Sequence, residues 1–552
     1  MSQRQFAQGL YTIAISALLA ACSGGTGVGP QVPTDSGEQS QAPQQLLNNA
    51  RERIRYREID MGTFGGPTSQ GTNLTLGGPL VVVGWSATSM PKPPQSNRVI
   101  CGGQDGFIPN ITHTFQWRDG NVTDLGTLGG PMFCSEPFWI NNRGESVGIS
   151  ENGLIDSAAG RSHPNCDNSA PLGPALNQSR PVLWNNGQIV DLGTFGGNQG
   201  IALSSNNRGQ IAGAALNAIP DPYSFWDIAI LCTTQGTQTR GFLWQNGHKI
   251  DLGTLGGSDT YAEFVNERGQ VSGSSYTNNT PNPVTGLPTL DPFLWQNGKM
   301  RDLGTLGGTF SVTNAMNNRG EVVGQSNLAG DLVTHPFVWD GSKLIDIGTA
   351  GGDMGFAWAI NDAGEVVGWS FTAGDAQVQG FIWKDGARTD LPPLPGACGS
   401  QAEAIDSGGR VLGQSAGCSF GGPDVVIWDR RDRLVDLNSL IAADSPLHLS
   451  FAGGPLSVTG PLDINDRGDV AGIGSPAGVS PVDAQSFGHA FLLIPCERDQ
   501  KQCEGDKAMS ASATRSNAAN YGASFSMRDP ARLIDLRRAR WIGRFRIHFP
   551  AK

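Results

Sequence analysis

Short segments in which apolar and polar residues alternate recur along most of the chain, in a fixed order of four. One copy contains TNAMN (313–317), EVVGQS (321–326) and PFVW (336–339), and the copy before it ends in DLGTLGG (302–308). Alternation over four to six residues predicts half-buried β-strands, and the intervening Asn-Gly and Arg-Gly pairs predict tight turns. We name the four segments a, b, c and d, and expect them to form antiparallel hairpins.

Segment b occurs eight times, at 80–86, 145–150, 210–215, 270–275, 321–326, 365–370, 410–415 and 469–474. Four strands per repeat of this length are typical of a β-propeller blade. Segment d is out of phase, because one copy (57–66) precedes every other segment and the last copy of a, b and c has no d after it.

We therefore predict an all-β fold, an eight-bladed β-propeller of four-stranded antiparallel blades. The N-terminal strand near Tyr56–Asp60 would complete the last blade and remove the exposed edges. The first copy and the last two d segments are degenerate, so seven blades plus a stray hairpin is the alternative. Composition agrees with a turn-rich β protein, since the chain has 77 Gly, 34 Pro and only 16% charged residues.

The motifs HPFVW (335–339), DLGTLGG (302–308) and INDAGEVVG (360–368) resemble those of the HAF-repeat family of bacterial extracellular proteins. The resemblance covers roughly residues 56 to 495. It implies a location at the cell surface and no known reaction, substrate or catalytic residue. No functional residue is therefore carried over from the family.

The N-terminus predicts export and lipid anchoring. The apolar run LYTIAISALLAAC is too short to span a bilayer and ends in Leu19-Ala20-Ala21-Cys22, which resembles a bacterial lipobox. That resemblance implies a lipoprotein signal peptide over 1–21 and acylation of Cys22, which anchors a chain stably to a membrane. Ser23 after the cysteine points to the outer membrane in proteobacterial lipoproteins.

Two further regions lie outside the repeats. Residues 22–55 are rich in Gly, Ser, Pro and Gln and predict a flexible tether. Residues 497–552 form a basic tail, with nine Lys or Arg and two Asp from Ala508 onward in a chain of net charge −11. The tail could contact anionic lipid or the acidic propeller, and a disordered tail without a role is the alternative. Export and the acidic body argue against a nucleic-acid partner.

The remaining cysteines are even in number, which in an exported chain predicts disulfides rather than metal ligands. No CxxC pair or histidine cluster accompanies them, so we expect no zinc and no other cofactor. Adjacency suggests the pairs Cys101–Cys134, Cys166–Cys232, Cys398–Cys418 and Cys496–Cys503.

Connection lengths differ between the two ends of the strands. The a–b and c–d turns are short throughout, whereas the first three b–c connections are long, at roughly 87–112, 151–180 and 216–239. Long loops gathered on one face predict a recognition surface. In the third loop, Tyr223 and Trp226 lie close to Asp221 and Asp227, a combination suited to sugars, because rings stack on C–H faces and acids accept hydroxyl groups. The alternative is that these aromatic residues fix the loop to the propeller.

The other motifs indicate structure rather than catalysis. The sequence GQSAG (413–417) matches the nucleophile-elbow pattern, but Ser415 belongs to segment b and lacks the strand-to-helix context that the motif needs. The Trp of segment c recurs in seven copies and predicts packing between blades. The Asp of DLGT is expected to fix a turn by accepting backbone N–H groups, with calcium binding as the alternative.

We expect a lipid-anchored, monomeric envelope protein that binds a glycan or protein ligand without catalysis. A polysaccharide-acting hydrolase or lyase, and a structural scaffold without a small ligand, are the alternatives.

Overall fold

The computed structural model describes residues 55–94, 108–156, 176–224, 236–417, 424–429, 433–442, 445–449, 463–480 and 483–496. The regular structure in these residues is almost entirely β-strand. The three short helical segments are η4 (Ala373–Asp375), η5 (Leu437–Leu440) and α3 (Ala484–Phe487). The predicted signal peptide, tether and basic tail lie outside the described residues.

Seven sets of four consecutive strands follow one another along the chain, each paired antiparallel in the order a-b-c-d. Their strands are β2 (Gly65–Leu74), β3 (Val81–Pro91), β4 (Asn110–Arg118) and β5 (Asn121–Asp124); β6 (Ser135–Ile140), β7 (Ser146–Asp156), β8 (Leu176–Asn185) and β9 (Gln188–Asp191); β10 (Gly196–Ser205), β11 (Ile211–Pro220), β12 (Thr237–Gln245) and β13 (His248–Asp251); β14 (Thr260–Val265), β15 (Val271–Tyr276), β16 (Leu290–Gln296) and β17 (Lys299–Asp302); β18 (Gly307–Met316), β19 (Val322–Leu328), β20 (Thr334–Trp339) and β21 (Leu344–Asp346); β22 (Gly351–Ile360), β23 (Val366–Thr372), β24 (Val378–Lys384) and β25 (Ala387–Leu391); and β26 (Ala397–Ile405), β27 (Val411–Gly417), β28 (Asp424–Asp429) and β29 (Arg433–Asp436).

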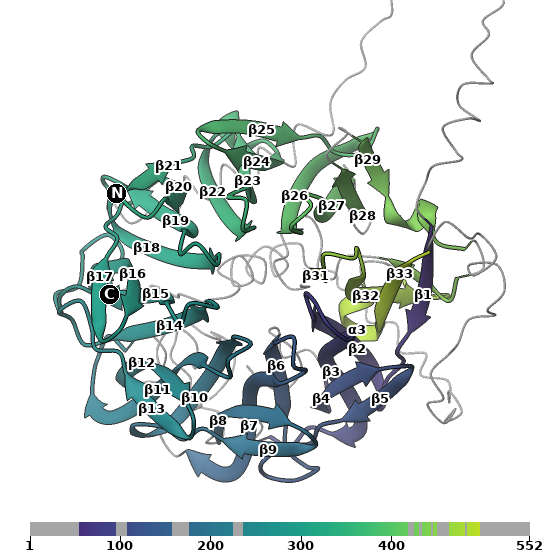
Figure 1. Ribbon diagram of the computed structural model, residues 1–552, viewed down its shortest axis with the longest axis horizontal. Helices are drawn as coiled ribbons and strands as arrows, with labels where there is room; N and C mark the ends of the chain where they lie inside the picture. Colours follow the sequence, from purple (N-terminus) through teal and green to yellow (C-terminus); the bar gives the residue numbers. More distant parts are fainter. Residues whose placement is uncertain are drawn as a thin grey trace, which may run out of the picture.

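One further set combines strands from both ends of the described chain. It contains β1 (Tyr56–Asp60), β30 (Leu447–Leu449), β31 (Asp463–Ile464), β32 (Val470–Pro476) and β33 (His489–Pro495). Strand β1 pairs antiparallel with β33, from Tyr56 opposite Pro495 to Asp60 opposite Phe491. Figure 1 shows the purple β1 beside the yellow β33, as the sequence predicts.

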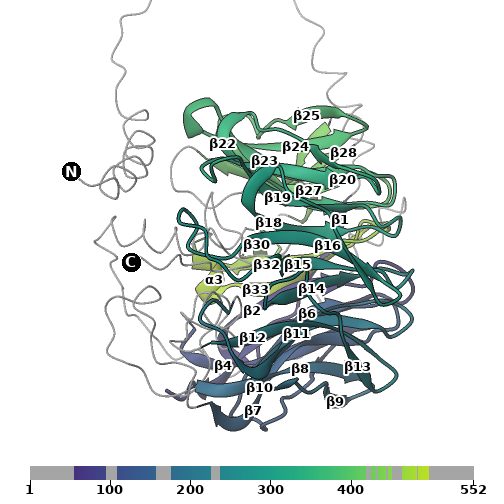
Figure 2. The ribbon, with the colours of Figure 1, turned by 90° about the vertical axis from the view of Figure 1, so that its left-hand side faces the viewer.

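The sets are arranged around a common centre, with the a strands innermost and the d strands outermost (Figure 1). Figure 2 shows the same arrangement from the side, with the sets stacked around the axis. This architecture is a β-propeller, so the predicted all-β fold is confirmed. The strands of the degenerate first copy, β2 and β3, form a complete set with β4 and β5.

The seven long a strands share one irregularity. Each pairs with its b strand through a register shift at the same place, which leaves one extra residue in the a strand. The extra residues are Thr72, Phe138, Leu203, Glu263, Asn314, Trp358 and Glu403. Opposite each shift lies the glycine of segment b, and a Cβ atom added there would lie 1.9–2.2 Å from a backbone oxygen of the a strand. Only glycine allows the bulged strand to approach this closely.

The c–d turns confirm the two-residue hairpins predicted from Asn-Gly pairs. Asn186 and Gly187, for example, both have positive φ values of 51° and 74°. Two consecutive residues with positive φ define the type I′ turn, whose twist matches that of the flanking strands. Turns with the same backbone follow β4, β12, β16 and β24.

Apolar side chains pack between neighbouring sets. In one cluster, Leu243 and Leu252 of the β10–β13 set contact Phe293 and Trp295 of the β14–β17 set. The Trp of segment c is buried in six of the seven copies, with exposed fractions of 3–8%. This confirms that these tryptophans pack between blades. Burial of each aromatic side chain contributes about 2 kcal/mol.

The first three b–c connections are shorter than predicted. Strands β3, β7 and β11 continue to Pro91, Asp156 and Pro220 and thus extend into stretches that the sequence assigns to loops. The pairing of each b strand with its c strand has one register shift near the end of the b strand. Beyond this shift the two strands pair again, over residues in which apolar and polar positions no longer alternate. These connections remain the longest, at 92–109, 157–175 and 221–236, against 329–333 and 373–377 in later blades.

Candidate functional site: the Asn-Arg-Gly turns around the central hollow

The turns between the a and b strands form a continuous polar layer around the centre of the propeller. In the β18–β19 turn, Asn317 is 4% exposed. Its Oδ1 accepts the backbone N–H groups of Arg319 and Glu321, both at 3.0 Å. Its Nδ2 donates to Glu321 Oε2 at 2.6 Å and to the backbone O of Asn361, in the next blade, at 3.0 Å. One asparagine therefore both closes its own turn and links two blades.

The same link recurs around the molecule. At six junctions, the Nδ2 of the Asn that begins the turn donates to a backbone oxygen of the next blade at 2.8–3.2 Å. These residues are Asn141, Asn206, Asn266, Asn317, Asn361 and Asn465. The other two junctions use a backbone donor: Gly77 N–H donates to Asn142 Oδ1 and Ser407 N–H to Asp466 Oδ1. Every set of strands is thus joined to its neighbour, including the last to the first.

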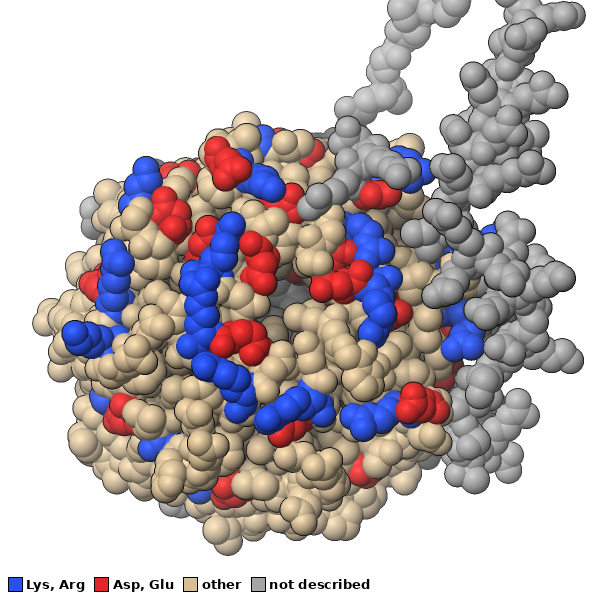
Figure 3. Space-filling view, in the orientation of Figure 1, with Lys and Arg blue, Asp and Glu red and all other residues tan. Residues whose placement is uncertain are grey.

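Five of the eight a–b turns have an arginine as their third residue. Figure 3 shows Lys and Arg side chains in a ring around the hollow, with Asp and Glu side chains on its inner side. Arg143 pairs with Glu145 at 2.5 Å, Arg319 with Glu321 at 2.6 Å and Arg467 with Asp469 at 2.9 Å. The arginine side chains are 43–48% exposed. In these three turns the arginine charge is paired within the turn, whereas Arg208 and Arg268 donate to the neutral oxygens Gln210 Oε1 and Arg319 O.

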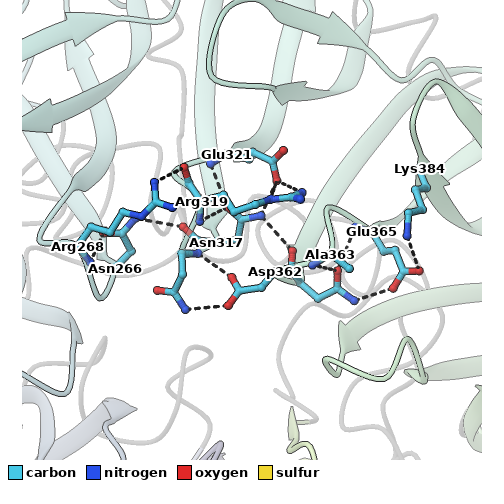
Figure 4. Close-up of polar contacts among 11 residues, drawn as sticks. Asn266, Arg268, Asn317, Arg319, Glu321, Asp362, Ala363, Glu365 and Lys384 are labelled. Atoms are coloured by element: carbon cyan, nitrogen blue, oxygen red, sulfur yellow. Dashed lines mark hydrogen bonds and ion pairs between the residues drawn. The ribbon is translucent and has the colours of Figure 1, made fainter.

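Two turns that lack the Arg keep the charge balance by other means. Ala363 replaces the Arg in the β22–β23 turn, and Lys384 of β24 pairs with Glu365 at 3.3 Å instead (Figure 4). In the β26–β27 turn, Asp406 replaces the Asn and pairs with Arg410. Arg410 then donates to the backbone O of Asp466 and so preserves the link to the next blade. Such compensation indicates that the turn layer serves the closure of the propeller.

The residues predicted to bind a ligand are only partly described. Tyr223 is half-buried, and its backbone O accepts the hydroxyl of Tyr276 at 3.1 Å. Asp221 is 5% exposed and accepts Tyr223 N–H at 2.8 Å and the hydroxyl of Ser258. The Asp221 side chain therefore fixes the start of the loop against the next blade. Trp226 and Asp227 lie outside the described residues.

The remaining sequence motifs have structural roles. Ser415 lies within strand β27, and its Oγ accepts the N–H of Leu394 at 2.9 Å. The Asp of DLGT accepts the N–H of the glycine two residues later in five blades, at 2.7–2.9 Å, which confirms the predicted turn. Within the described residues, no three His, Cys, Asp or Glu side chains converge in a way that could hold a metal ion. The described helices are all too short or too polar to cross a membrane.

Glu136, on the innermost strand β6, is a buried carboxyl group that the sequence did not single out. Burial raises the pKa of Glu136 from its ordinary 4.5 to about 8. The folded protein therefore keeps a proton on Glu136 at neutral pH, whereas the unfolded chain loses it.

Because the folded state binds more protons between pH 4.5 and 8, stability falls as the pH rises through this window. We expect the melting temperature to decline from pH 5 to pH 8 and to decline less in Glu136→Gln. Thermal unfolding over this range tests the difference. Glu58 and Asp291 also have raised pKa values, so parallel profiles of variant and parent would contradict the role of Glu136.

The fold and the turn layer place this protein in the class of β-propellers. Comparison with solved structures gives the following similar chains. The chain is similar to the β-propeller domain of the Trilobed protease from Pyrococcus furiosus, with 10% identity, a TM-score of 0.39, and 69% of this chain and 99% of that one covered. It is also similar to the Dos1 propeller (9%, TM-score 0.37, 80% and 95% covered). A third similar structure is an acylaminoacyl peptidase complex (11%, TM-score 0.37), of which it covers 58%.

Neither a family model nor a curated protein matches the sequence.

Proposed function

We propose that this protein is a lipid-anchored propeller of the bacterial cell envelope that binds a glycan or protein through the face carrying its b–c connections, without catalysis. Three parts of this proposal come from the sequence: the acylation of Cys22, the outer-membrane location and the relation to HAF repeats. Its main support is the contrast between the two faces. The side chains of the a–b turns are committed to one another, whereas the b–c connections vary in length and leave room for recognition.

The positions of the described chain ends agree with this orientation. Tyr56 lies opposite Pro495, and Cys496 N–H donates to Arg55 O at 2.7 Å. Strands β33 and β1 are the c and d strands of their blade, so the ends meet where a c–d turn would lie. An anchor on the N-terminal side would therefore hold the turn face toward the membrane and leave the b–c face exposed to partners.

We further propose that disulfides stiffen the recognition face, in the pairs Cys101–Cys134, Cys166–Cys232 and Cys398–Cys418, with Cys496–Cys503 beyond the last strand. The location of two of these cysteines supports the proposal. Cys134 and Cys398 lie at or just before the start of an a strand, on the same end of the blades as the b–c connections. Stiff loops lose less conformational entropy on binding.

The binding proposal is tested by thermal unfolding of the full-length protein with purified envelope glycans. A ligand of the folded state raises the melting temperature with its concentration. We expect one glycan to do so, and the Tyr223→Ala/Trp226→Ala variant to lose most of the shift. Arg143→Ala, on the opposite face, is the matched control and should keep it. A shift that disappears in Arg143→Ala but persists in the double variant would contradict the assignment of the face.

A further inference from the structure

Two residues before the register partner of the segment d Asp, most c strands carry a basic residue that pairs with this Asp. His113 Nδ1 lies 2.7 Å from Asp124, Arg180 Nε lies 3.0 Å from Asp191, and Arg240 Nη2 lies 2.9 Å from Asp251. The same pairing joins His335 to Asp346 and His489 to Asp60, at 2.9 and 3.0 Å. The propeller thus places a cationic or hydrogen-bonding nitrogen at this position again and again.

Two blades without His or Arg at this position have a basic side chain from elsewhere near the pair. In the β22–β25 blade, Arg388 of the d strand itself pairs with Asp390 at 3.0 Å. In the β26–β29 blade, Asp424 occupies this c-strand position near Asp436, and His448 Nε2 lies 4.0 Å from Asp424 Oδ1.

The β14–β17 blade breaks this rule, because Asp291 occupies this c-strand position and lies beside Asp302 without a described cation. The nearest basic residue of the d strand, Arg301, is directed elsewhere. It donates to the backbone oxygens of Gly341 and Ser342 and lies 4.9 Å from the ring centre of Trp339.

One oxygen of this acid pair has no partner. Asp291 is 8% exposed, and its buried Oδ1 receives no hydrogen bond from any described residue. A buried carboxylate oxygen without a donor is costly unless a proton or a cation compensates it. Asp302 is exposed, so a small ion can reach the pair from solvent.

A third oxygen is expected at the same place. In other blades a second nitrogen of the side chain that pairs with the Asp contacts a backbone oxygen seven residues after that Asp. His113 Nε2 lies 3.2 Å from Pro131 O, and Arg240 Nη1 lies 3.3 Å from Ser258 O. The equivalent residue here is Thr309. Leu290, next to Asp291, bridges in parallel to Phe310, next to Thr309. The two segments are therefore adjacent in space.

We propose that Asp291, Asp302 and the backbone oxygen of Thr309 form a binding site for a hard divalent cation, calcium or magnesium. The ion takes the place that a His or Arg side chain fills in the other blades. Oxygen-only ligands, with water completing the coordination, suit these two cations. The bound ion neutralises the acid pair and so fastens the c strand to the d strand of this blade.

The test is thermal unfolding and calorimetric titration of the full-length protein at pH 7.5, with EDTA, calcium or magnesium. We expect a saturable rise in melting temperature with one cation and at least a tenfold loss of its affinity in Asp291→Asn. Asp291→His places in this blade the residue found in three others, and should raise the melting temperature in EDTA and abolish the response to the cation. Asp124→Asn, in a blade with its own histidine, is the matched control and should respond as the parent does.

Two outcomes overturn the proposal. A cation response that persists in Asp291→Asn places the site elsewhere. No response to either cation, together with a pH dependence near neutrality that Asp291→Asn removes, shows that the pair holds a shared proton instead.

Discussion

Gly324→Ala is expected to lower the free energy of unfolding by about 3 kcal/mol, at the upper end of the range for overpacking a well-packed interior. A Cβ atom at this position would lie 2.0 Å from the backbone O of Val312 and 3.0 Å from Thr313 Cα. Both atoms belong to the main chain of β18, which is fixed by pairing and cannot move aside as a flexible side chain would. The β18 and β19 strands must therefore separate at the bulge.

The matched control is Gly298→Ala in the c–d turn of the preceding blade. Gly298 has a φ of 79° and nothing within 4 Å of an added Cβ atom, so only backbone strain of about 1 kcal/mol applies. Chemical denaturation of both variants measures the difference. Equal losses of stability would show that the strand glycine is not required for the close approach.

Asn317→Ala is expected to cost about 3 kcal/mol, because it leaves several buried polar groups without partners. The N–H groups of Arg319 and Glu321 lose their acceptor, and the backbone O of Asn361 loses the donor that joins the two blades. Denaturant unfolding followed by both fluorescence and circular dichroism measures the loss. We also expect the two probes to separate, since the blades on either side become less strongly coupled.

Asn318→Ala is the control for this variant. Asn318 makes comparable hydrogen bonds, to Glu267 N–H and Asp362 Oδ2 at 3.0 Å, but it is exposed. Water can replace these bonds, so the expected loss is below about 1 kcal/mol. A similar cost for both variants would contradict the special role of the buried asparagine.

The local features of the fold could be predicted because each depends on residues close in sequence. Asn186 and Gly187 predict a type I′ turn, alternating residues predict the strands, and Trp295 at a fixed place in its segment predicts packing. The closure by β1 was predictable from the displaced d segment at 57–66, although its pairing partner lies more than four hundred residues away.

The features that remained hidden depend on contacts between blades. Nothing near Asn317 in the sequence shows that its side chain reaches Asn361, because the two lie one blade apart. The bulge at Asn314 could not be predicted either. The extra residue lies within a segment whose sequence pattern predicts a single regular strand. In hindsight, the glycine in every b segment was the available signal, because glycine inside a strand indicates a bulge or a close approach.

The proposed site on the b–c face was harder still to predict, since its residues occur in segments that do not repeat. Asp221 illustrates the limit. The sequence places it beside aromatic residues on a long loop, but the fold turns its carboxylate inward to Ser258. The direction of a loop side chain follows from the surface beneath the loop, which local patterns do not describe.

The pairing of Tyr56 with Pro495 has a topological consequence. The two ends of the propeller occupy the positions that flank an ordinary c–d turn, so a short linker between them would convert the domain into a circle without a new crossing. Such a circular chain could be cut at another loop, and the strands would keep the same order around the axis. The break beside β1 therefore leaves the pairing within that blade unchanged, because β33 and β1 pair as the c and d strands of one blade.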